Sequence, residues 1–331
     1  MIVGVLRGGT SSEYNLSLKT GAAMMAALPE DRYEVRDIFI DKSGMWHVRG
    51  TPSTPVRAFS QIDVALNGLH GGVGEDGTVH RILQRAGVPY AGSSGLASGI
   101  ALNKIRAREI LQRAGIRMPR AISFSLSNRL NTAEMTQMTF DQFGPPYVVK
   151  PPSEGASHGI VIAQTLHDLP DALGDVLDQF GMALVEEFIR GRQASVGVIE
   201  KFRREQLYAL PPALVILPEG ARILERGHHE EGGVSHLVPS DFTYQEKRTL
   251  MDMARAAHRA LDLAHFSRSD LIVAPPSSAK ALEGKSRTYL LEINATPGLY
   301  PGASFPMMLE SVGSSVGDFL EHAIKLARGT A

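Results

Sequence analysis

The residues with the clearest chemistry lie on two segments near the end of the chain. Both segments have the composition of β-strands, in which alternate side chains share a face. One segment therefore presents Glu292 with Asn294, and the other presents Arg268 with Asp270. The Pro-, Ser- and Gly-rich connection, residues 275–286, would let the two strands pair as a hairpin. We therefore expect these four side chains to meet.

Such a hairpin would form a metal site beside a cationic group. Asp270, Glu292 and Asn294 offer hard oxygen ligands, which suit Mg²⁺ or Mn²⁺ bridging nucleotide phosphates. Arg268 would lie next to that metal, where it could bind a phosphoryl group or a developing oxyanion. The alternative is a surface ion pair with an asparagine that ends a strand.

A second candidate site holds phosphates and a nucleotide base. The apolar strand 146–150 ends at Lys150, and a small, flexible loop follows to Gly159. Backbone N–H groups in such a loop can approach phosphate oxygens while the lysine neutralises their charge. The lysine precedes the glycines, so this is not a Walker loop. Further on, an apolar strand runs into the polar segment 186–193, whose backbone could hydrogen-bond an adenine edge; both patterns also occur on ordinary exposed strands and loops.

Two glycine-rich turns follow strands in the first part of the chain. In the first turn, Glu13 could bind a substrate ammonium, or it could form a capping box with Thr10 at the start of a helix. In the second, residues 70–78, the glycines match a dinucleotide-binding spacing, but two carboxylates inside the loop would repel a pyrophosphate. We reject an NAD site there and expect a tight turn that presents His70 to a cleft.

Composition limits the classes of function. A chain of 331 residues is long enough for two or three domains. Its net charge of −1 gives no basic field for nucleic acid and no polybasic stripe for a membrane surface. The absence of cysteine excludes thiolate nucleophiles, thiolate metal sites and disulfides. Residues 1–7 are too short an apolar run for a signal peptide, and no stretch approaches a membrane span, so we expect a cytoplasmic protein.

Strand and helix patterns alternate along the first third of the chain and predict a parallel α/β sheet. Strands are expected at 2–6, 35–40 and 64–69, and helices from the first turn to residue 28 and at 79–86. Turn residues cluster at 89–95, where we place a domain boundary. A helix is expected at about 102–114, then a polar stretch, 125–139. In a long helix at 244–263, four apolar residues recur at helical spacing and predict core packing: Leu250, Met253, Ala257 and Leu261.

Taken together, the motifs resemble those of the D-alanine–D-alanine ligases of the ATP-grasp superfamily. The resemblance covers nearly the whole chain and depends on the combination of the segments 8–13, 70–78 and 292–298 in this order. It implies an α/β (α+β) fold with three domains, at 1–95, 96–183 and 184–331, the first with a parallel sheet. It also implies ATP-dependent joining of two D-alanines through an acyl-phosphate for peptidoglycan precursor synthesis, with small-molecule partners. The oligomeric state stays open, a homodimer included.

The resemblance also assigns roles to individual residues. Glu13 and Ser17 would bound the first D-amino-acid site with His70 nearby, and Ser304 would lie near the second. Glu13, Ser157, Arg268 and the Gly298 backbone would be the catalytic groups, the last two stabilising the tetrahedral intermediate. The implied ATP-binding residues are Lys104, Lys150, Glu186, Glu187, Phe188, Ile189 and Gln193. Asp270, Glu292 and Asn294 would hold Mg²⁺ or Mn²⁺.

Several positions depart from the family pattern. Gln193 stands where the family has a ribose-binding glutamate, Ala156 where it has a serine, and Ala303-Ser304 where it has serine-leucine. The segment Arg226–Gly233 has two histidines in place of a lysine–tyrosine pair. The alternatives are therefore a ligase that uses D-lactate or another D-amino acid, or a catalytically weak nucleotide-binding relative. A zinc hydrolase built from His228, His229, Glu230 and His236 is disfavoured, because adjacent histidines point apart on most backbones.

Overall fold

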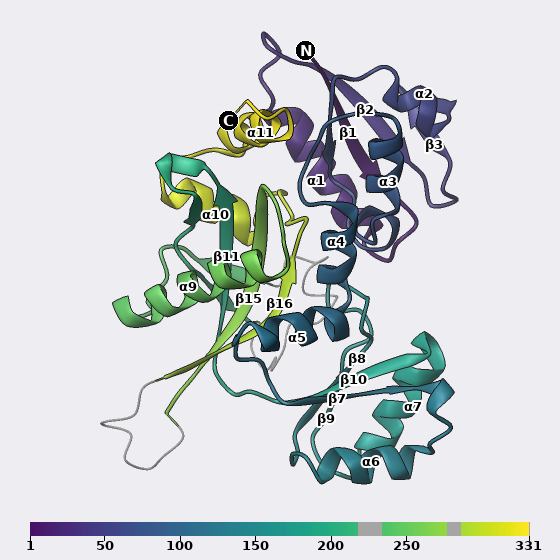
Figure 1. The fold of residues 1–331 in the computed structure, drawn as a ribbon, viewed down its shortest axis with the longest axis vertical. Coiled ribbons are helices and arrows are strands. Elements are labelled where there is room, and N and C mark those ends of the chain that lie inside the picture. The colour runs from purple at the N-terminus through teal and green to yellow at the C-terminus, as the bar shows by residue number, and fades with distance from the viewer. Residues whose placement is uncertain (218–233, 277–285, 331) are drawn as a thin grey trace.

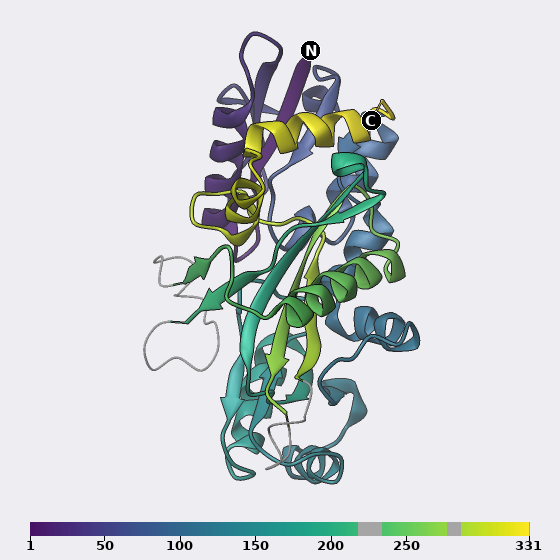
Figure 2. The same ribbon diagram turned by 90° about the vertical axis from the view of Figure 1, so that its left-hand side faces the viewer.

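The computed structural model describes residues 1–217, 234–276 and 286–330. In these ranges the chain forms three β-sheets with helices packed against them. The first sheet lies at one end of the molecule, the second at the opposite end and the third between them (Figures 1 and 2). The α/β class predicted from the sequence is confirmed. No helix among the described residues is long and apolar enough to cross a membrane.

The first sheet is parallel at its centre, as the alternating pattern predicts. Its strand order is β4-β3-β2-β1-β5-β6, and β1 pairs in parallel with β2 and β5. The short strands β3 and β4, which the sequence analysis missed, add an antiparallel edge. The elements are β1 (Ile2–Gly8), α1 (Tyr14–Ala27), β2 (Glu34–Ile40), β3 (Trp46–Val48), β4 (Thr51–Ser53), α2 (Pro55–Phe59), β5 (Val64–Asn67), α3 (Thr78–Arg85) and β6 (Tyr90–Ala91).

The second sheet is antiparallel, with strand order β7-β10-β8-β9. Two helices share its core, in which Met135, Tyr147 and Leu173 are fully buried. The helix α6 lies in the polar stretch for which no element was predicted, and a capping box between Asn131 and Glu134 starts it. The elements are β7 (Ala121–Ser125), α6 (Thr132–Phe140), β8 (Tyr147–Lys150), β9 (Val161–Ala163), α7 (Leu169–Phe180) and β10 (Met182–Glu187).

The third sheet has the order β14-β13-β11-β15-β16, with β12 beside β11. The helix α9 packs on it through Leu250 and Ala257, and Leu261 follows directly after the helix, which ends at Ala260 rather than at the expected residue 263. These three are buried as predicted, while Met253 is partly buried against the same core. The elements are β11 (Arg192–Glu200), β12 (Leu207–Ala209), β13 (Ala213–Ile216), β14 (Ser235–Leu237), α9 (Tyr244–Ala260), β15 (Phe266–Ala274) and β16 (Arg287–Asn294).

Helices at two places in the chain pack away from their sequence neighbours. The helices α4 (Gly95–Leu102) and α5 (Lys104–Arg113) share a core with the third sheet and α9. The helix α11 (Val316–Ala327), which follows α10 (Ser304–Ser311), packs on α1 and the first sheet, so both termini lie at the same end of the molecule (Figures 1 and 2). The domain boundaries expected from the sequence stay a prediction.

Candidate active site

A cavity of about 590 Å³ is lined by strand residues of the second and third sheets and by helix and loop residues beside the first sheet. It brings together every residue that the sequence analysis assigned to a site, with one exception. The residues gathered are Glu13, His70, Lys104, Lys150, Ser157, Glu186, Glu187, Phe188, Ile189, Gln193, Arg268, Asp270, Glu292, Asn294, Gly298 and Ser304. Segments that lie almost 300 residues apart in the sequence therefore meet in one place.

The exception is Ser17, which does not line the cavity. Its side chain is fully buried on α1, where the hydroxyl accepts a hydrogen bond from the Gly8 N–H and donates one to the Gly68 carbonyl, both at 2.8 Å. The hydroxyl is thus used in joining the end of β1 to the segment after β5. The predicted role of Ser17 in bounding the substrate site stays a prediction, because in this structure its hydroxyl joins these two segments and does not line the cavity.

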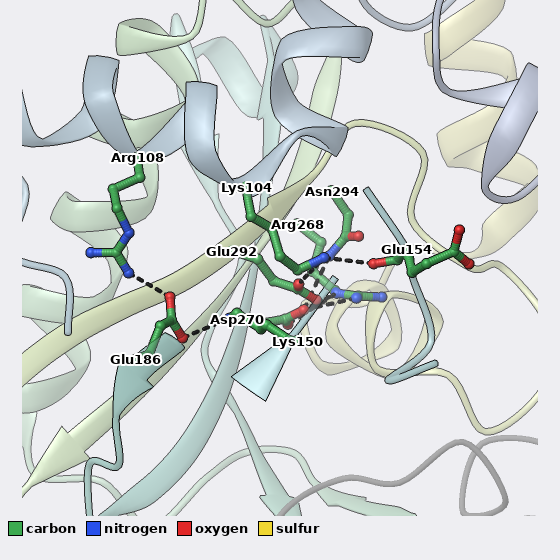
Figure 3. Close-up of polar contacts among 9 residues, drawn as sticks. All are labelled: Lys104, Arg108, Lys150, Glu154, Glu186, Arg268, Asp270, Glu292 and Asn294. Carbon is green, nitrogen blue, oxygen red and sulfur yellow. Dashed lines mark hydrogen bonds and ion pairs between the residues drawn. The ribbon is translucent and has the colours of Figure 1, made fainter. Parts of the chain in front are cut away.

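The hairpin predicted from alternating side chains is present. Strands β15 and β16 pair antiparallel, with Arg268 opposite Asn294 and Asp270 opposite Glu292. The Arg268 guanidinium lies 2.8 Å from Asp270 Oδ2, and the Asn294 amide donates to the same oxygen at 3.1 Å (Figure 3). Burial disfavours the charged form of Arg268, but contact with Asp270 outweighs it and raises the pKa of Arg268. The arginine is therefore a fixed cation at this end of the hairpin.

The donor chemistry of the hairpin fits a hard divalent metal. Two carboxylates and one amide on facing strands are oxygen donors of the kind that Mg²⁺ and Mn²⁺ take. Among the described residues, no group of three or more His, Cys, Asp and Glu side chains could hold a metal, so the amide of Asn294 would have to complete the set. Of the zinc alternative, His228, His229 and Glu230 lie outside the described residues.

Lys104 connects the hairpin to the loop that follows β8. It is the first residue of α5, and its Nζ lies 3.3 Å from Glu292 Oε2 and donates to the Glu154 carbonyl at 2.6 Å (Figure 3). Burial would raise the pKa of Glu292, but the charges of Lys104, Lys150 and Arg268 lower it well below its usual value. Glu292 is therefore ionised and surrounded by cations.

Lys150 belongs to a buried network of three charges. Its Nζ lies 2.7 Å from Glu186 Oε2, and the other oxygen of Glu186 contacts the Arg108 guanidinium (Figure 3). Less than a tenth of each side chain is exposed. Arg108 also donates to the Pro119 carbonyl. Because Arg108 and Lys150 come from α5 and β8, Glu186 ties a helix of the third sheet's core to the second sheet.

The segment 186–189 lines the cavity where the sequence resemblance places adenine. The Glu187 carboxylate is occupied by Arg120, which donates from its backbone N–H at 2.8 Å and its Nε at 2.7 Å. The N–H groups of Glu187 and Phe188 are bonded to the carbonyls of Arg120 and Pro146. Within the described residues the N–H of Ile189 has no such partner, so it stays available to a ligand.

Glu13 lies outside a helix rather than within one. The helix α1 begins at Tyr14, and Glu13 precedes it without any side-chain cap, so the capping box with Thr10 is wrong. Two glycines make room for its carboxylate: a Cβ would stand 2.2 Å from Glu13 Oε1 at Gly155 and 2.7 Å from it at Gly71. The Glu13 carboxylate is therefore held between a loop of the first sheet and the loop after β8.

The surroundings of Glu13 favour the neutral forms of three titratable side chains. Burial, reinforced by the charge of Glu75, raises the pKa of Glu13 to about 8. Burial also raises the pKa of Glu75 to about 7, although this carboxylate accepts the Gly71 N–H at 2.8 Å. Burial lowers the pKa of His70 to about 4, and its Nε2 lies 2.7 Å from Thr20 Oγ1. A neutral imidazole beside two poorly neutralised carboxylates suits a ligand that brings a positive charge.

The cavity and network residues that the sequence analysis did not assign include Glu75, Arg108 and Tyr300. Glu75 was noted there as an obstacle to a pyrophosphate, but not as a partner of Glu13. Arg108 follows Lys104 by four residues on α5, and this spacing was a signal that both face the same side. Tyr300 lies in the irregular segment between β16 and α10, where no periodic pattern could have indicated its direction.

The residues that depart from the family pattern lie at several positions around the cavity. Gln193 lies on β11 and lines the cavity. Ala156 and Ser157 have left-handed backbone angles, with φ of 45° and 60°, and both line the cavity. Ser304 is buried at the start of α10 and also lines it. The segment Arg226–Gly233 lies outside the described residues.

Comparisons with known proteins agree on one family. A family model described as the D-ala D-ala ligase C-terminus matches residues 110–325. A D-alanine–D-alanine ligase of Desulforudis audaxviator is 32% identical, over 98% of each chain. The ATP-complexed D-alanine–D-alanine ligase of Bacillus anthracis has a TM-score of 0.79 at 26% identity, over 99% of this chain and 98% of that one. The D-Ala:D-Ser ligase VanG of Enterococcus faecalis shares the fold, with a TM-score of 0.82 at 22% identity over 98% and 99% of the two chains. This chain belongs to the D-alanine–D-alanine ligase family.

Proposed function

We propose that this protein joins two D-alanines to D-alanyl-D-alanine, with ATP as the energy source. The observation that carries the proposal is a single cavity with a phosphate-binding centre and an ammonium-binding end. Lys104, Lys150 and Arg268 supply the positive charge of the first, and the buried carboxylates of Glu13 and Glu75 supply the second. A ligase that phosphorylates an amino acid needs both ends within reach of each other.

In the first step, the carboxylate of the first D-alanine attacks the γ-phosphorus of ATP. A bond forms between the carboxylate oxygen and phosphorus, the bond to the β–γ bridging oxygen breaks, and ADP leaves. Glu13 and Glu75 would hold the ammonium of this substrate, while Lys104 and Lys150 spread the negative charge on the phosphates. Such positioning is the main contribution of a protein to phosphoryl transfer.

In the second step, the deprotonated amine of the second D-alanine attacks the acyl carbon. The new peptide bond joins the nitrogen to the acyl carbon. The bond between the acyl carbon and the phosphate oxygen breaks, inorganic phosphate leaves, and the nitrogen gives up one proton. Arg268 and the backbone N–H of Gly298 would stabilise the oxyanion of the tetrahedral intermediate. Ser157 and its loop would exclude water, which would otherwise hydrolyse the acyl-phosphate.

The donor set of the hairpin supports a role for Mg²⁺ or Mn²⁺. Asp270, Glu292 and Asn294 would hold the ion. When bound, the ion neutralises phosphate charge. Lys104 and Arg268 are the protein's own cations at the same carboxylates.

The proposed setting follows from the proposed reaction. D-Alanyl-D-alanine is a peptidoglycan precursor, so we place the protein in the cytoplasm, where ATP is available, with D-alanine and ATP as its partners. Neither a nucleic acid nor a membrane takes part in this reaction. Three domains, one for each sheet, would close on the cavity that they share. A homodimer stays a prediction.

The test is phosphate release from ATP, measured over a panel of D- and L-amino acids and D-hydroxy acids, with product identification by mass spectrometry. We expect release with D-alanine and a divalent metal, and D-alanyl-D-alanine as the product. D-Alanyl-D-lactate or another mixed product as the major species would replace the proposed second substrate. ATP turnover with none of these acids would overturn the proposal.

A further inference from the structure

Tyr300 lines the active-site cavity and has no assigned role. It lies in the turn between β16 and α10, which is closed by a hydrogen bond of 3.1 Å from the Ala303 N–H to the Tyr300 carbonyl. His236, on β14, holds the same turn, because its Nδ1 lies 3.2 Å from the Gly302 carbonyl. The phenol is therefore placed by a turn that is held from two sides.

The Tyr300 ring lies directly on Gly298. A Cβ at Gly298 would stand 3.2 Å from Tyr300 Cδ1 and only 2.7 Å from Cε1, and the second distance is shorter than real Cβ atoms show. The glycine is thus the residue that lets the ring pack here. Because the Gly298 backbone is proposed to bind the oxyanion, the ring forms a wall immediately beside the carbon that reacts.

The Tyr300 hydroxyl is free to bind a ligand. Among the described residues it forms no hydrogen bond, and the side chain is partly buried in the cavity. Burial raises the pKa of Tyr300, and the charge of Glu13 acts in the same direction while that of Arg268 opposes it. The phenol is therefore protonated at neutral pH and can donate a hydrogen bond.

We propose that Tyr300 is a specificity residue for the second substrate. Its ring limits the space for that substrate's side chain beside Gly298, and its hydroxyl donates a hydrogen bond to that substrate's carboxylate. The first substrate has its own recognition groups in the same cavity, Glu13 and Glu75, whose carboxylates suit an ammonium rather than a carboxylate. Arg268 is already bound by Asp270, so a second carboxylate gains from a neutral donor that forms no hydrogen bond within the described part of the chain. The inference rests on the proposed ligase function.

The proposal predicts different effects for the hydroxyl and the ring. Tyr300→Phe keeps the wall and removes the donor, so the apparent KM of the second D-alanine should rise roughly tenfold or more, as for loss of a hydrogen bond to a charged group. The KM values of ATP and of the first D-alanine should stay unchanged. Tyr300→Val removes the wall. In a competition between D-alanine and D-valine, it should raise the share of dipeptide with D-valine at the carboxyl end roughly tenfold.

The experiment measures phosphate release and product ratios for wild type, both Tyr300 variants and Tyr244→Phe. Tyr244 is 80% exposed at the start of α9 and serves as the matched control. Equal shifts of all three KM values would reveal general damage to the site and overturn the proposal, as would unchanged values in both Tyr300 variants. If wild type releases no phosphate with ATP and D-alanine, the ligase assignment itself fails, which distinguishes that failure from one confined to Tyr300.

Discussion

The two ends of the active-site cavity differ in whether their buried carboxylates are paired with cations. At the nucleotide end, Glu186 is buried between Arg108 and Lys150, and each of its oxygens meets a cation. At the amino-acid end, Glu13 and Glu75 are also withdrawn from water, but the described residues offer neither an ion pair. Buried charges are costly unless they are paired. On the proposed assignment, the nucleotide end is neutralised by the chain's own cations, whereas the amino-acid end suits a ligand that brings a positive charge.

The proposed phosphate-binding centre is built from other residues of the same cavity. Lys104 contacts Glu292 across the cavity, and Arg268 contacts Asp270 on the hairpin. These side chains are more exposed than the Glu186 network, with about a third of Glu292 accessible. Partial exposure lets them exchange partners when phosphates and metal arrive. Substitutions at the centre and at each end should therefore differ in size and in the substrate that they affect.

The largest effect is expected at the centre. Glu292→Gln removes a carboxylate that faces Lys104 and that we assign to the metal, so turnover should fall by about two orders of magnitude or more while the fold is kept. Steady-state phosphate release and circular dichroism would measure the two quantities. Glu109→Gln, on the exposed side of α5, is the control. Activity close to wild type in the Glu292 variant would remove the metal assignment.

A smaller effect is expected where the lysines meet ATP. Lys150→Ala or Lys104→Ala should raise the apparent KM for ATP, lower kcat or both, by roughly tenfold, because each removes a charge from the phosphate-binding centre. The KM values for D-alanine should change little. Initial rates with each substrate varied in turn would separate these constants. A change confined to the D-alanine constants would show that the nucleotide lies elsewhere in the cavity.

The ion pairs of the nucleotide end can be disrupted without changing a residue that we assign to ligand binding. Arg108→Met leaves Glu186 with Lys150 alone, so the carboxylate should hold that lysine more tightly and keep it from the phosphates. We expect the KM for ATP to rise about threefold to tenfold and the protein to be less stable. Arg108→Lys restores the positive charge but not the planar, two-pronged geometry of the guanidinium. It should therefore recover part of the stability and part of the affinity for ATP. If the methionine variant loses stability while its KM for ATP stays at the wild-type value, Arg108 supports the fold and does not position Lys150.

The parts of the site that the sequence could predict are those set by local geometry. Alternation along a strand places Glu292 with Asn294 and Arg268 with Asp270, and the hairpin then follows from a short connection. Lys150 ends a strand and is followed by a loop, which is again a local pattern. The parallel order of β2, β1 and β5 follows from the alternation of strands and helices.

The parts that were missed depend on contacts between distant segments. Nothing local shows that α5 packs on the third sheet, which is what brings Arg108 to Glu186. Glu13 has the spacing of a capping residue. Its carboxylate lies in the cavity instead, because Gly71 and Gly155 leave room for it there. Ser17 has a suitable type and position along the helix, but α1 turns it towards Gly68 rather than the cavity. Tertiary packing decides each of these cases.

The smallest predicted effect concerns the pH dependence of stability at the unpaired end. The pKa of Glu13 is raised to about 8 and that of Glu75 to about 7, whereas an unfolded glutamate titrates near 4.5. Between these limits the folded state binds more protons than the unfolded state. The stability that comes from the protonated carboxyls is therefore fully present below about pH 4.5 and is lost as the pH rises through 7 and 8.

Glu13→Gln should remove part of this pH dependence, because an amide keeps the shape of the protonated carboxyl and cannot ionise. The free energy of unfolding, measured by urea titration from pH 5 to pH 8.5 without ligands, should fall less steeply in the variant and exceed that of wild type at the upper end. Buried histidines such as His70 contribute a slope of opposite sign, but they are common to both proteins and cancel in the difference. Parallel curves for wild type and variant would mean that the Glu13 carboxyl is already ionised at neutral pH. The amino-acid end would then be as well neutralised as the nucleotide end, and the contrast between them would not hold.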